Sequence, residues 1–344
     1  MRILFLGETY RADAQTWIRG IENASGISIE TKEIPRTGGR ISRMVHAIKF
    51  LLSLAFSRTK YDLVLAERAT SYGFFSLLVN AKVRAVAQQG ISDVWPEHGF
   101  AGWYKGILQS STYKKADLIH AWGYVMTFAM ITSGATPSKI LVRPKGLDLR
   151  KFQFEGMERK KANLAIVTRS LYPIYRHSEI LEAISILKRK GIELSCNMVG
   201  DGEELANLKS ITKALDLENQ VNWLGRIQND DLPNYLNQAQ LYIAVPETEG
   251  VSASLFEAMA CGCFPIVSDL PANRAFIQSG KNGFLVPVGD YTALAHAIEK
   301  FLNNTESYHE AIHQNRIFIE RNCNLKLNME DFFTRYSQLL NQKA

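Results

Sequence analysis

The 344-residue sequence has only four cysteines, which excludes the usual cysteine-based scaffolds. Cys196, Cys261, Cys263 and Cys323 are too few and too scattered for a disulfide framework. None of them has the two-residue spacing of a zinc knuckle. Such sparse cysteine is typical of a reducing compartment, and we expect a cytoplasmic protein.

Long apolar runs and metal-binding motifs are also missing. The longest apolar stretch, residues 44–56, contains His46 and Lys49 and is too polar to span a bilayer. The apolar run at residues 3–6 is too short for a signal peptide. No Asp-x-Asp pair and no His/Cys cluster with ligand spacing is present, so the sequence gives no support to a metal-dependent mechanism.

Negative charge is scarce in the first half of the chain. Residues 1–150 hold 20 Lys and Arg against 11 Asp and Glu, whereas residues 151–344 hold 20 against 23. This asymmetry favours an anionic partner for the first half: a membrane surface, a phosphorylated substrate or nucleic acid. Nucleic acid has only the charge in its favour, because no recognition motif is present, and we expect none.

The length and the 46 % hydrophobic content predict two globular domains. Short apolar runs alternate with helical patterns, which predicts βαβ units, parallel sheets and an α/β fold of two Rossmann-like, doubly wound domains. Predicted strands cover residues 3–6, 63–66, 84–87, 118–119, 164–167, 194–199, 221–224, 241–245, 264–267 and 284–286. Predicted helices cover residues 178–190, 203–215, 231–239, 252–260 and 291–302.

The alternation breaks at the polar stretch 150–162, where we place the linker. The predicted domains are therefore residues 1–155 and 160–324. Asp290 is a predicted helix N-cap, and Gly191 and Gly262 are predicted helix stops.

The segment 246–262 carries the most informative chemistry. A strand ends at Val245, a loop carries Glu249 and Gly250, and a helix begins near Ser252. Free N–H groups at a helix start suit phosphate. Glu257 lies about 9 Å further along that helix at 1.5 Å per residue. The two carboxylates could hold two ends of a nucleotide sugar. In the alternative interpretation, Glu249 is a charged loop residue and Glu257 is a solvated helix residue.

This segment, with residues 264–274 and 280–290, resembles the family-4 retaining glycosyltransferases, also called glycosyl transferases group 1. Glu249 and Glu257, with seven residues between them, match the family signature. Three further motifs follow the family's order: residues 141–148 (LVRPKGLD), 199–202 (VGDG) and 223–226 (WLGR). The resemblance implies the GT-B fold, with the donor held by the C-terminal domain, the acceptor by the N-terminal one, and a C-terminal helix, 325–344, packed back on the first domain.

The resemblance also implies donor-binding roles. Glu249 would face the donor sugar hydroxyls, and Glu257 the ribose. Three positions would lie near the nucleobase: Gly200, Gly225 and Arg226. Backbone amides of the helix start would approach sugar and phosphate: Gly250, Val251, Ser252, where the family has glycine, and Ala253.

The family neutralises the donor pyrophosphate with an Arg and a following Lys, because the leaving diphosphate gains negative charge in the transition state. Arg169 matches the family Arg. The Lys is missing, and Arg176 is its nearest stand-in, although Arg does not replace Lys isosterically. The alternative is that Arg169 and Arg176 are surface charges that do not bind the pyrophosphate.

In the first domain, one position matches the family pattern and two depart from it. Gln89 stands where the family has a His close to the reacting sugar, and it cannot take a proton. Asp93 matches an acidic family position and could orient the acceptor hydroxyl. The family's glycine pair after the first strand is reduced to Gly7. The implied catalytic set is Glu249, Asp93, Gln89 and Arg169.

A helical stripe at positions 41, 44, 45, 48, 51, 52 and 55 has two interpretations. One is a core-packing helix with a solvated basic face. The other is a membrane-facing helix, or a contact to a lipid-linked or phosphorylated acceptor. Both stay open.

The resemblance implies a metal-independent, cofactor-free retaining glycosyltransferase. It would move a sugar from a nucleoside-diphosphate sugar to a hydroxyl of a glycan or lipid-linked acceptor, in polysaccharide or glycolipid biosynthesis, in the cytoplasm or on the inner face of the membrane. The absent His and Lys support one alternative, a non-catalytic nucleotide-sugar-binding subunit. A GT-B-like nucleotide-sugar epimerase is the other, against which the Glu249…Glu257 context argues.

Overall fold

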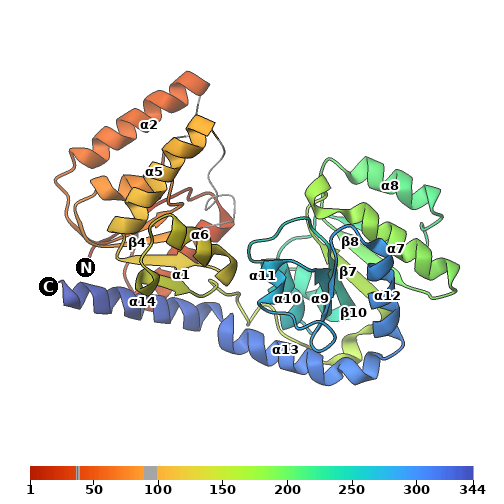
Figure 1. Ribbon diagram of the computed structural model, residues 1–344. Helices are drawn as coiled ribbons and strands as arrows, with labels where there is room; N and C mark the ends of the chain where they lie inside the picture. The colour runs from red at the N-terminus through yellow and green to blue at the C-terminus, as the bar shows by residue number, and fades with distance from the viewer. Residues whose placement is uncertain (36, 38, 89–98, 344) are drawn as a thin grey trace. The chain divides into compact units, whose positions relative to one another are not determined.

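The computed structural model describes residues 1–35, 37, 39–88 and 99–343, which divide into two compact units (Figure 1). Unit 1 comprises Met1–Lys145 and Leu325–Ala344, and unit 2 comprises Gly146–Asn324. Each unit contains a six-stranded sheet whose paired strands are parallel. The predicted α/β fold with two doubly wound domains is confirmed.

The sheet of unit 1 has the strand order β2-β1-β3-β4-β5-β6. Its strands are β1 (Ile3–Leu6), β2 (Ile29–Lys32), β3 (Tyr61–Glu67), β4 (Ala81–Gln88), β5 (Leu118–Ala121) and β6 (Ile140–Val142). Its helices are α1 (Ala12–Ser25), α2 (Arg40–Ala55), α3 (Tyr72–Phe75), η1 (Ser76–Leu78), α5 (Gly99–Lys115), η2 (Tyr124–Met126), α6 (Thr127–Thr132), η3 (Pro137–Lys139) and α14 (Leu325–Gln342). Every residue of β1 is buried, as expected for a parallel strand covered on both faces.

Strands β2 and β6 were not predicted from the sequence, and both lie at sheet edges. In β2 only Ile29 is buried, so the strand has no apolar run to reveal it. All three residues of β6 are half-buried. An edge strand needs less apolar surface than a central one, which is why a search for buried runs misses it.

The sheet of unit 2 has the order β12-β11-β10-β7-β8-β9. Its strands are β7 (Lys161–Thr168), β8 (Ser195–Val199), β9 (Val221–Gly225), β10 (Ala239–Ala244), β11 (Phe264–Ser268) and β12 (Phe284–Val286). Its helices are η4 (Met157–Arg159), η5 (Pro173–Tyr175), α7 (His177–Arg189), α8 (Leu205–Ala214), α9 (Leu232–Gln238), α10 (Ala253–Ala260), α11 (Pro271–Arg274), α12 (Tyr291–Leu302), η6 (Thr305–Tyr308) and α13 (His309–Asn322).

The predicted helix ends of unit 2 are confirmed. The Asp290 carboxylate accepts a hydrogen bond from the N–H of Ala293 at 2.8 Å and caps α12. Gly191 and Gly262 follow α7 and α10 with φ of 74° and 75°, a left-handed conformation that glycine adopts without strain.

The stretch that the sequence marks as a linker packs against unit 2. Phe152 is 4 % exposed and belongs to the apolar core that contains Leu236 and Phe256. The N–H of Leu147 donates to the carbonyl of Cys323 at 2.8 Å. A Cβ atom on Gly262 would lie 2.4 Å from the Phe154 ring, so glycine there admits the aromatic side chain. The unit boundary accordingly falls at Lys145 and Gly146.

Helix α14 brings the end of the chain onto unit 1, where it packs against α1 and β4. Met329 lies over Gly20, whose missing Cβ would be 2.5 Å from the Met329 Cγ. Tyr336 is fully buried, and its hydroxyl is 2.6 Å from Nε2 of His120 in a hydrogen bond. Burial lowers the pKa of His120 to about 3, so this histidine is neutral at pH 7.

No helix in the described part of the chain is both long and apolar enough to cross a membrane.

We predict that Tyr336→Phe lowers the free energy of unfolding of unit 1 by roughly 1–3 kcal/mol, the cost of leaving a buried polar group unpaired. The phenylalanine ring fills the same space, so the substitution removes the hydrogen bond to His120 without opening a cavity. Urea denaturation measures the change. In the matched control, Tyr291→Phe, the side chain is 42 % exposed and we expect a change within about 0.5 kcal/mol. Equal effects of the two substitutions would contradict the prediction.

Candidate functional site

Arg169 and Glu249 meet at the carboxyl end of the unit 2 sheet. Arg169 directly follows β7, and Glu249 lies in the loop between β10 and α10, where β7 and β10 are neighbouring strands. The guanidinium forms an ion pair with the Glu249 carboxylate and donates to Oγ of Ser252 at 2.6 Å. The side chains of Arg169 and Glu249 are only 15 % and 12 % exposed. The fold thus brings these three predicted residues together at the sheet edge where doubly wound folds bind ligands.

Two glycines of the loop after β8 let it lie against the backbone that carries Arg169. A Cβ on Gly200 would lie 2.2 Å from the carbonyl oxygen of Arg169, and one on Gly202 would lie 2.3 Å from that of Leu171. The N–H of Gly200 also donates to the carbonyl of Gly225 at 2.9 Å. The predicted positions Gly200 and Gly225 are therefore adjacent, whereas the side chain of Arg226 is exposed.

The amino end of α10 lies beside Arg169. Ser252 is the N-cap, and its Oγ accepts a hydrogen bond from the N–H of Leu255 at 3.2 Å. The N–H of Gly250 donates to the Glu249 carboxylate at 3.2 Å. Val251 is half-buried and Ala253 is exposed. Because a helix start carries partial positive charge, this loop and Arg169 make one electropositive surface next to a carboxylate.

Glu257 lies on α10 and is half-buried. Its carboxylate makes no hydrogen bond or ion pair with any residue that the structure describes. Burial raises its pKa, while the charges of Lys151 and Arg169 act in the opposite direction. Lys151 itself forms an ion pair with Asp230 at 2.7 Å. Glu257 therefore presents a carboxylate whose acceptor positions are open to a ligand.

Arg176 differs from Arg169 in its partners. It forms ion pairs with Glu179 and, at 2.6 Å, with Glu247, and these carboxylates raise its pKa. Its backbone has a left-handed φ of 52° just before α7. A phosphate would have to compete with two carboxylates for this guanidinium. Arg169 has one carboxylate partner, and its Nε is buried without a hydrogen-bond partner among the described residues.

His177 is a buried neighbour that the sequence analysis did not single out. It is 3 % exposed, and neither ring nitrogen has a hydrogen-bond partner within the described residues. Burial and the positive charge of Arg169 lower its pKa to about 4. A neutral imidazole therefore lies within the field of the Arg169 cation. Nothing in the local sequence distinguishes this histidine from a solvated one.

The first-domain predictions are only partly described. Gln89 and Asp93 lie outside the described residues. Gly7 follows β1 in unit 1, and a Cβ there would lie 2.6 Å from the Phe5 ring and 2.8 Å from the Glu67 carboxylate. The glycine thus makes room for a buried carboxyl at the end of β3.

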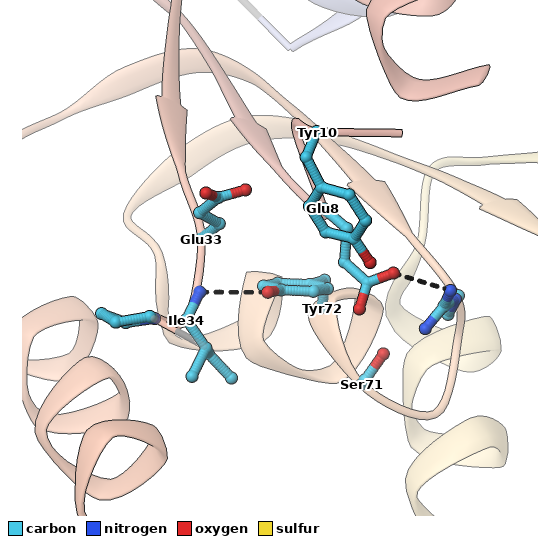
Figure 2. A pocket seen from close by; sticks show the side chains of 8 residues that line it. Glu8, Tyr10, Glu33, Ile34, Ser71 and Tyr72 are labelled. Atoms are coloured by element: carbon cyan, nitrogen blue, oxygen red, sulfur yellow. Dashed lines mark hydrogen bonds and ion pairs between the residues drawn. The ribbon is translucent and has the colours of Figure 1, made fainter. Parts of the chain in front are cut away.

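Unit 1 has a pocket of its own at the carboxyl ends of β1, β2 and β3 (Figure 2). The cavity measures about 650 Å³. Its lining comprises Glu8, Tyr10, Glu33, Ile34, Pro35, Arg68, Ser71 and Tyr72. The hydroxyl of Tyr72 accepts a hydrogen bond from the N–H of Ile34 at 3.0 Å, and the Glu8 carboxylate pairs with Arg68 at 2.8 Å. Carboxylates, hydroxyls and aromatic rings together suit a ligand rich in hydroxyl groups.

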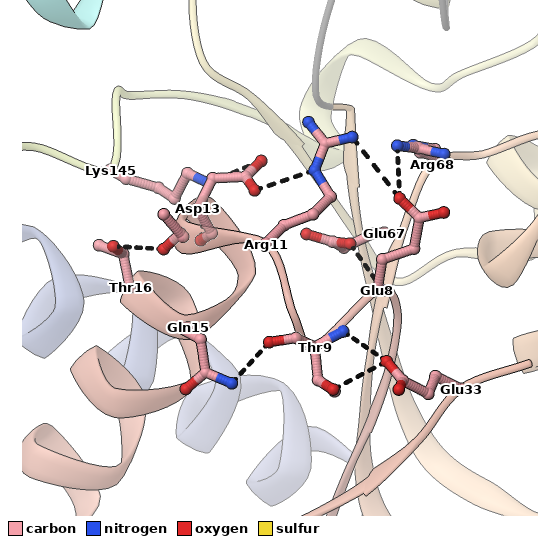
Figure 3. Close-up of polar contacts among 11 residues, drawn as sticks. Glu8, Thr9, Arg11, Asp13, Gln15, Thr16, Glu33, Glu67, Arg68 and Lys145 are labelled. Carbon is pink, nitrogen blue, oxygen red and sulfur yellow. Dashed lines mark hydrogen bonds and ion pairs between the residues drawn. The ribbon is translucent and has the colours of Figure 1, made fainter. Parts of the chain in front are cut away.

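A network of charges lies beside this pocket (Figure 3). Glu67, at the end of β3, accepts a hydrogen bond from the N–H of Glu8 at 3.2 Å, and burial raises its pKa to about 7. Lys145 donates to the backbone carbonyl of Asp13 at 3.0 Å and holds the start of α1. Polar residues directly after β1 and β3, where the chain order of the sheet reverses, are a sequence signal that could have indicated this site.

Within the described residues, no group of three or more His, Cys, Asp or Glu side chains is arranged to hold a metal ion.

Comparison with known proteins identifies the family that unit 2 resembles. Residues 149–318 match the family described as Glycosyl transferases group 1. An uncharacterised glycosyltransferase of Haemophilus influenzae is 31 % identical over 143 residues, which cover 41 % of this chain and 40 % of that protein. The chain spans between 40 % and 49 % of the length of three such curated relatives.

Two comparisons extend over more of the chain. The UDP-Gal:alpha-D-GlcNAc-diphosphoundecaprenol alpha-1,3-galactosyltransferase of Escherichia coli is 26 % identical over 287 residues, covering 74 % of this chain and 70 % of that protein. The crystal structure of Anabaena HepE in complex with UDP has a TM-score of 0.78 at 16 % identity, covering 98 % of this chain and all of that one. The chain has the fold of the GT-B glycosyltransferases, and over residues 149–318 it is similar to Glycosyl transferases group 1.

Proposed function

We propose that the protein is a retaining glycosyltransferase of the family-4 type that uses a nucleoside-diphosphate sugar and needs no metal ion. The observation that carries the proposal is the grouping of Arg169, Glu249 and Ser252 at the start of α10, with the open carboxylate of Glu257 further along the same helix. This grouping lies inside the region that matches Glycosyl transferases group 1. The acceptor would be a hydroxyl of a glycan or a lipid-linked saccharide in polysaccharide or glycolipid biosynthesis.

The donor nucleotide would be held by hydrogen bonds from unit 2. Glu257 would accept bonds from the two ribose hydroxyls, because its carboxylate has no partner among the described residues and offers two oxygens. The adjacent turns at Gly200 and Gly225 would lie near the nucleobase, with Arg226 at their edge. Glu249 would orient the sugar hydroxyls, and the backbone amides of residues 250–253 would approach sugar and phosphate.

Breaking the bond between C1 of the sugar and the diphosphate oxygen leaves that electron pair on the leaving group, which gains one negative charge that must be stabilised. Arg169 is the cation best placed for this task, since its side chain is largely buried and its Nε–H has no partner in the part of the chain that the structure describes. A buried cation acts in a low dielectric, where its field is stronger than in water. Arg176, already paired with two carboxylates, would give weaker assistance.

The pocket of unit 1 is the structure's best candidate for the acceptor. Glu8 and Glu33 would accept hydrogen bonds from saccharide hydroxyls, and the Ser71 hydroxyl would accept or donate one. Tyr10 and Tyr72 would contact the apolar face of a sugar ring. Gln89 and Asp93, the predicted groups at the reacting sugar, remain part of the proposal.

The first prediction concerns donor binding. Isothermal titration with UDP-, GDP-, dTDP- and ADP-sugars should find one nucleotide that binds selectively. Glu257→Gln should weaken that binding on the order of tenfold to a hundredfold, because a charged acceptor of hydrogen bonds is replaced by a neutral one. No binding of any nucleotide sugar would contradict the donor site.

The matched control for Glu257 is Glu182→Gln. Glu182 is also a half-buried helical glutamate of unit 2, on α7, and no hydrogen bond or ion pair with a described residue is found for it. We expect its donor affinity to match that of the unchanged protein. A similar loss in both variants would show that the effect is not specific to Glu257.

The second prediction concerns the leaving group. Arg169→Lys should lower kcat about 10²–10³-fold, as expected when one preorganised hydrogen-bond donor to a developing charge is lost. Affinity for the nucleoside diphosphate should fall, while affinity for the free nucleoside should stay unchanged. Release of nucleoside diphosphate in the presence of saccharide and polyprenyl-linked acceptors measures the rate.

The control for Arg169 is Arg159→Lys, an arginine of unit 2 that pairs with Glu155 outside the site. It should leave both the rate and the affinity unchanged. Equal loss of nucleoside and nucleoside-diphosphate affinity in Arg169→Lys would argue against a phosphate contact. Donor binding without transfer to any acceptor, in the unchanged protein, would favour a non-catalytic nucleotide-sugar-binding subunit.

A further inference from the structure

The apolar stripe of α2 faces solvent rather than the core. Phe50 and Leu54 pack into unit 1, at 8 % and 2 % exposed, on the opposite side of the helix. The stripe itself remains exposed: Ile41 75 %, Met44 60 %, Val45 40 %, Ile48 50 % and Leu52 51 %. Phe56, just after the helix, is 80 % exposed. The interpretation of this stripe as core packing is therefore wrong, because other residues of α2 fill that role.

A second exposed apolar stripe lies on α5. Phe100 is 80 % exposed, and its ring centroid is 5.6 Å from that of Trp103. Trp103, Tyr104 and Ile107 are 61 %, 53 % and 45 % exposed. The helical segment Tyr72–Leu78 lies between the two helices, since η1 packs against α2 and α3 packs against α5 (Figure 1). We call the exposed apolar residues of α2, Phe56, Leu78 and those of α5 the α2/α5 surface.

The two helices of this surface, α2 and α5, carry basic residues and no acidic ones. The sequence contains no Asp or Glu from Ile34 to Tyr61, but six Lys or Arg. Helix α5 likewise has no acidic residue and carries Lys105, Lys114 and Lys115. Lys49, Arg58 and Lys60 are exposed. Large apolar side chains together with basic ones fit an anionic, apolar partner.

We infer that the α2/α5 surface binds the face of a lipid bilayer that contains anionic lipids. Aromatic and aliphatic side chains would enter the boundary between headgroups and acyl chains, where Trp and Tyr are favoured. The Lys and Arg side chains would remain at the level of the anionic headgroups. A second copy of the chain is a poorer partner, because a symmetric interface would place these basic segments against each other. This inference does not depend on the proposed glycosyltransferase activity.

The test is flotation of the full chain with two kinds of vesicle, one of phosphatidylcholine alone and one of equal phosphatidylcholine and phosphatidylglycerol. We expect strong binding to the anionic vesicles, weak binding to the neutral ones, and a decrease with salt. Absence of flotation with both vesicles would overturn the inference.

Leu52→Ser and Leu327→Ser form a matched pair, because both leucines are helical and 51 % exposed, on α2 and α14. Leu52→Ser should weaken vesicle binding about fivefold or more, from the apolar area no longer buried. Leu327→Ser should leave it unchanged. Equal effects would place the binding elsewhere.

The charge contribution has its own pair of variants. Lys49→Gln should weaken binding to the anionic vesicles about fivefold, the effect expected for one basic residue near such a surface. The control is Lys209→Gln, because Lys209 is an exposed lysine on α8 of unit 2, and this substitution should leave vesicle binding unchanged.

Size-exclusion chromatography tests whether a second copy of the chain covers the surface instead. A dimer in solution that Leu52→Ser converts to monomer would show that a second copy covers the surface and would overturn the bilayer assignment.

Discussion

The close approach of two loops at the end of β7 is the constraint on which the unit 2 site depends. Gly200 and Gly202 have no Cβ, so the turn after β8 lies directly against the carbonyl groups of Arg169 and Leu171. With its backbone fixed in this way, Arg169 reaches Glu249 and Ser252 from the neighbouring strand β10. A side chain at either glycine would displace the Arg169 backbone and, with it, the charge at the start of α10.

Unit 1 is also a doubly wound parallel sheet, with a different strand order and different chemistry. Its pocket also lies at the carboxyl ends of neighbouring parallel strands, but it is lined by Glu8, Glu33 and tyrosines, and Arg68 is already paired with Glu8. An electropositive loop in unit 2 and a carboxylate-lined, hydroxyl-rich pocket in unit 1 suit different ligands. The contrast supports the proposed assignment of the anionic nucleotide to unit 2 and of an uncharged saccharide to unit 1.

Much of the unit 2 fold could be predicted because its central strands are buried on both faces and read as apolar runs. Helix ends could be predicted as well, because capping depends on residues next to the helix in sequence, such as Asp290 and Gly262. The edge strands β2 and β6 have no such runs and were missed. The stretch around Phe152 looked like a linker because most of its neighbours are polar, although the ring itself is buried in unit 2.

The α/β class, the alternation of strands and helices, and the spacing of Glu249 and Glu257 follow from local patterns along the chain and can be predicted from them. Which charges have partners depends on the tertiary structure. The sequence does not distinguish Arg169 from Arg176. In the structure, Arg169 keeps a buried Nε–H without a partner among the described residues, whereas Arg176 lies between two carboxylates. The tertiary structure also decided that the apolar stripe of α2 faces solvent. Periodicity shows that a helix has an apolar face, but only the packing of neighbouring elements determines whether that face is covered.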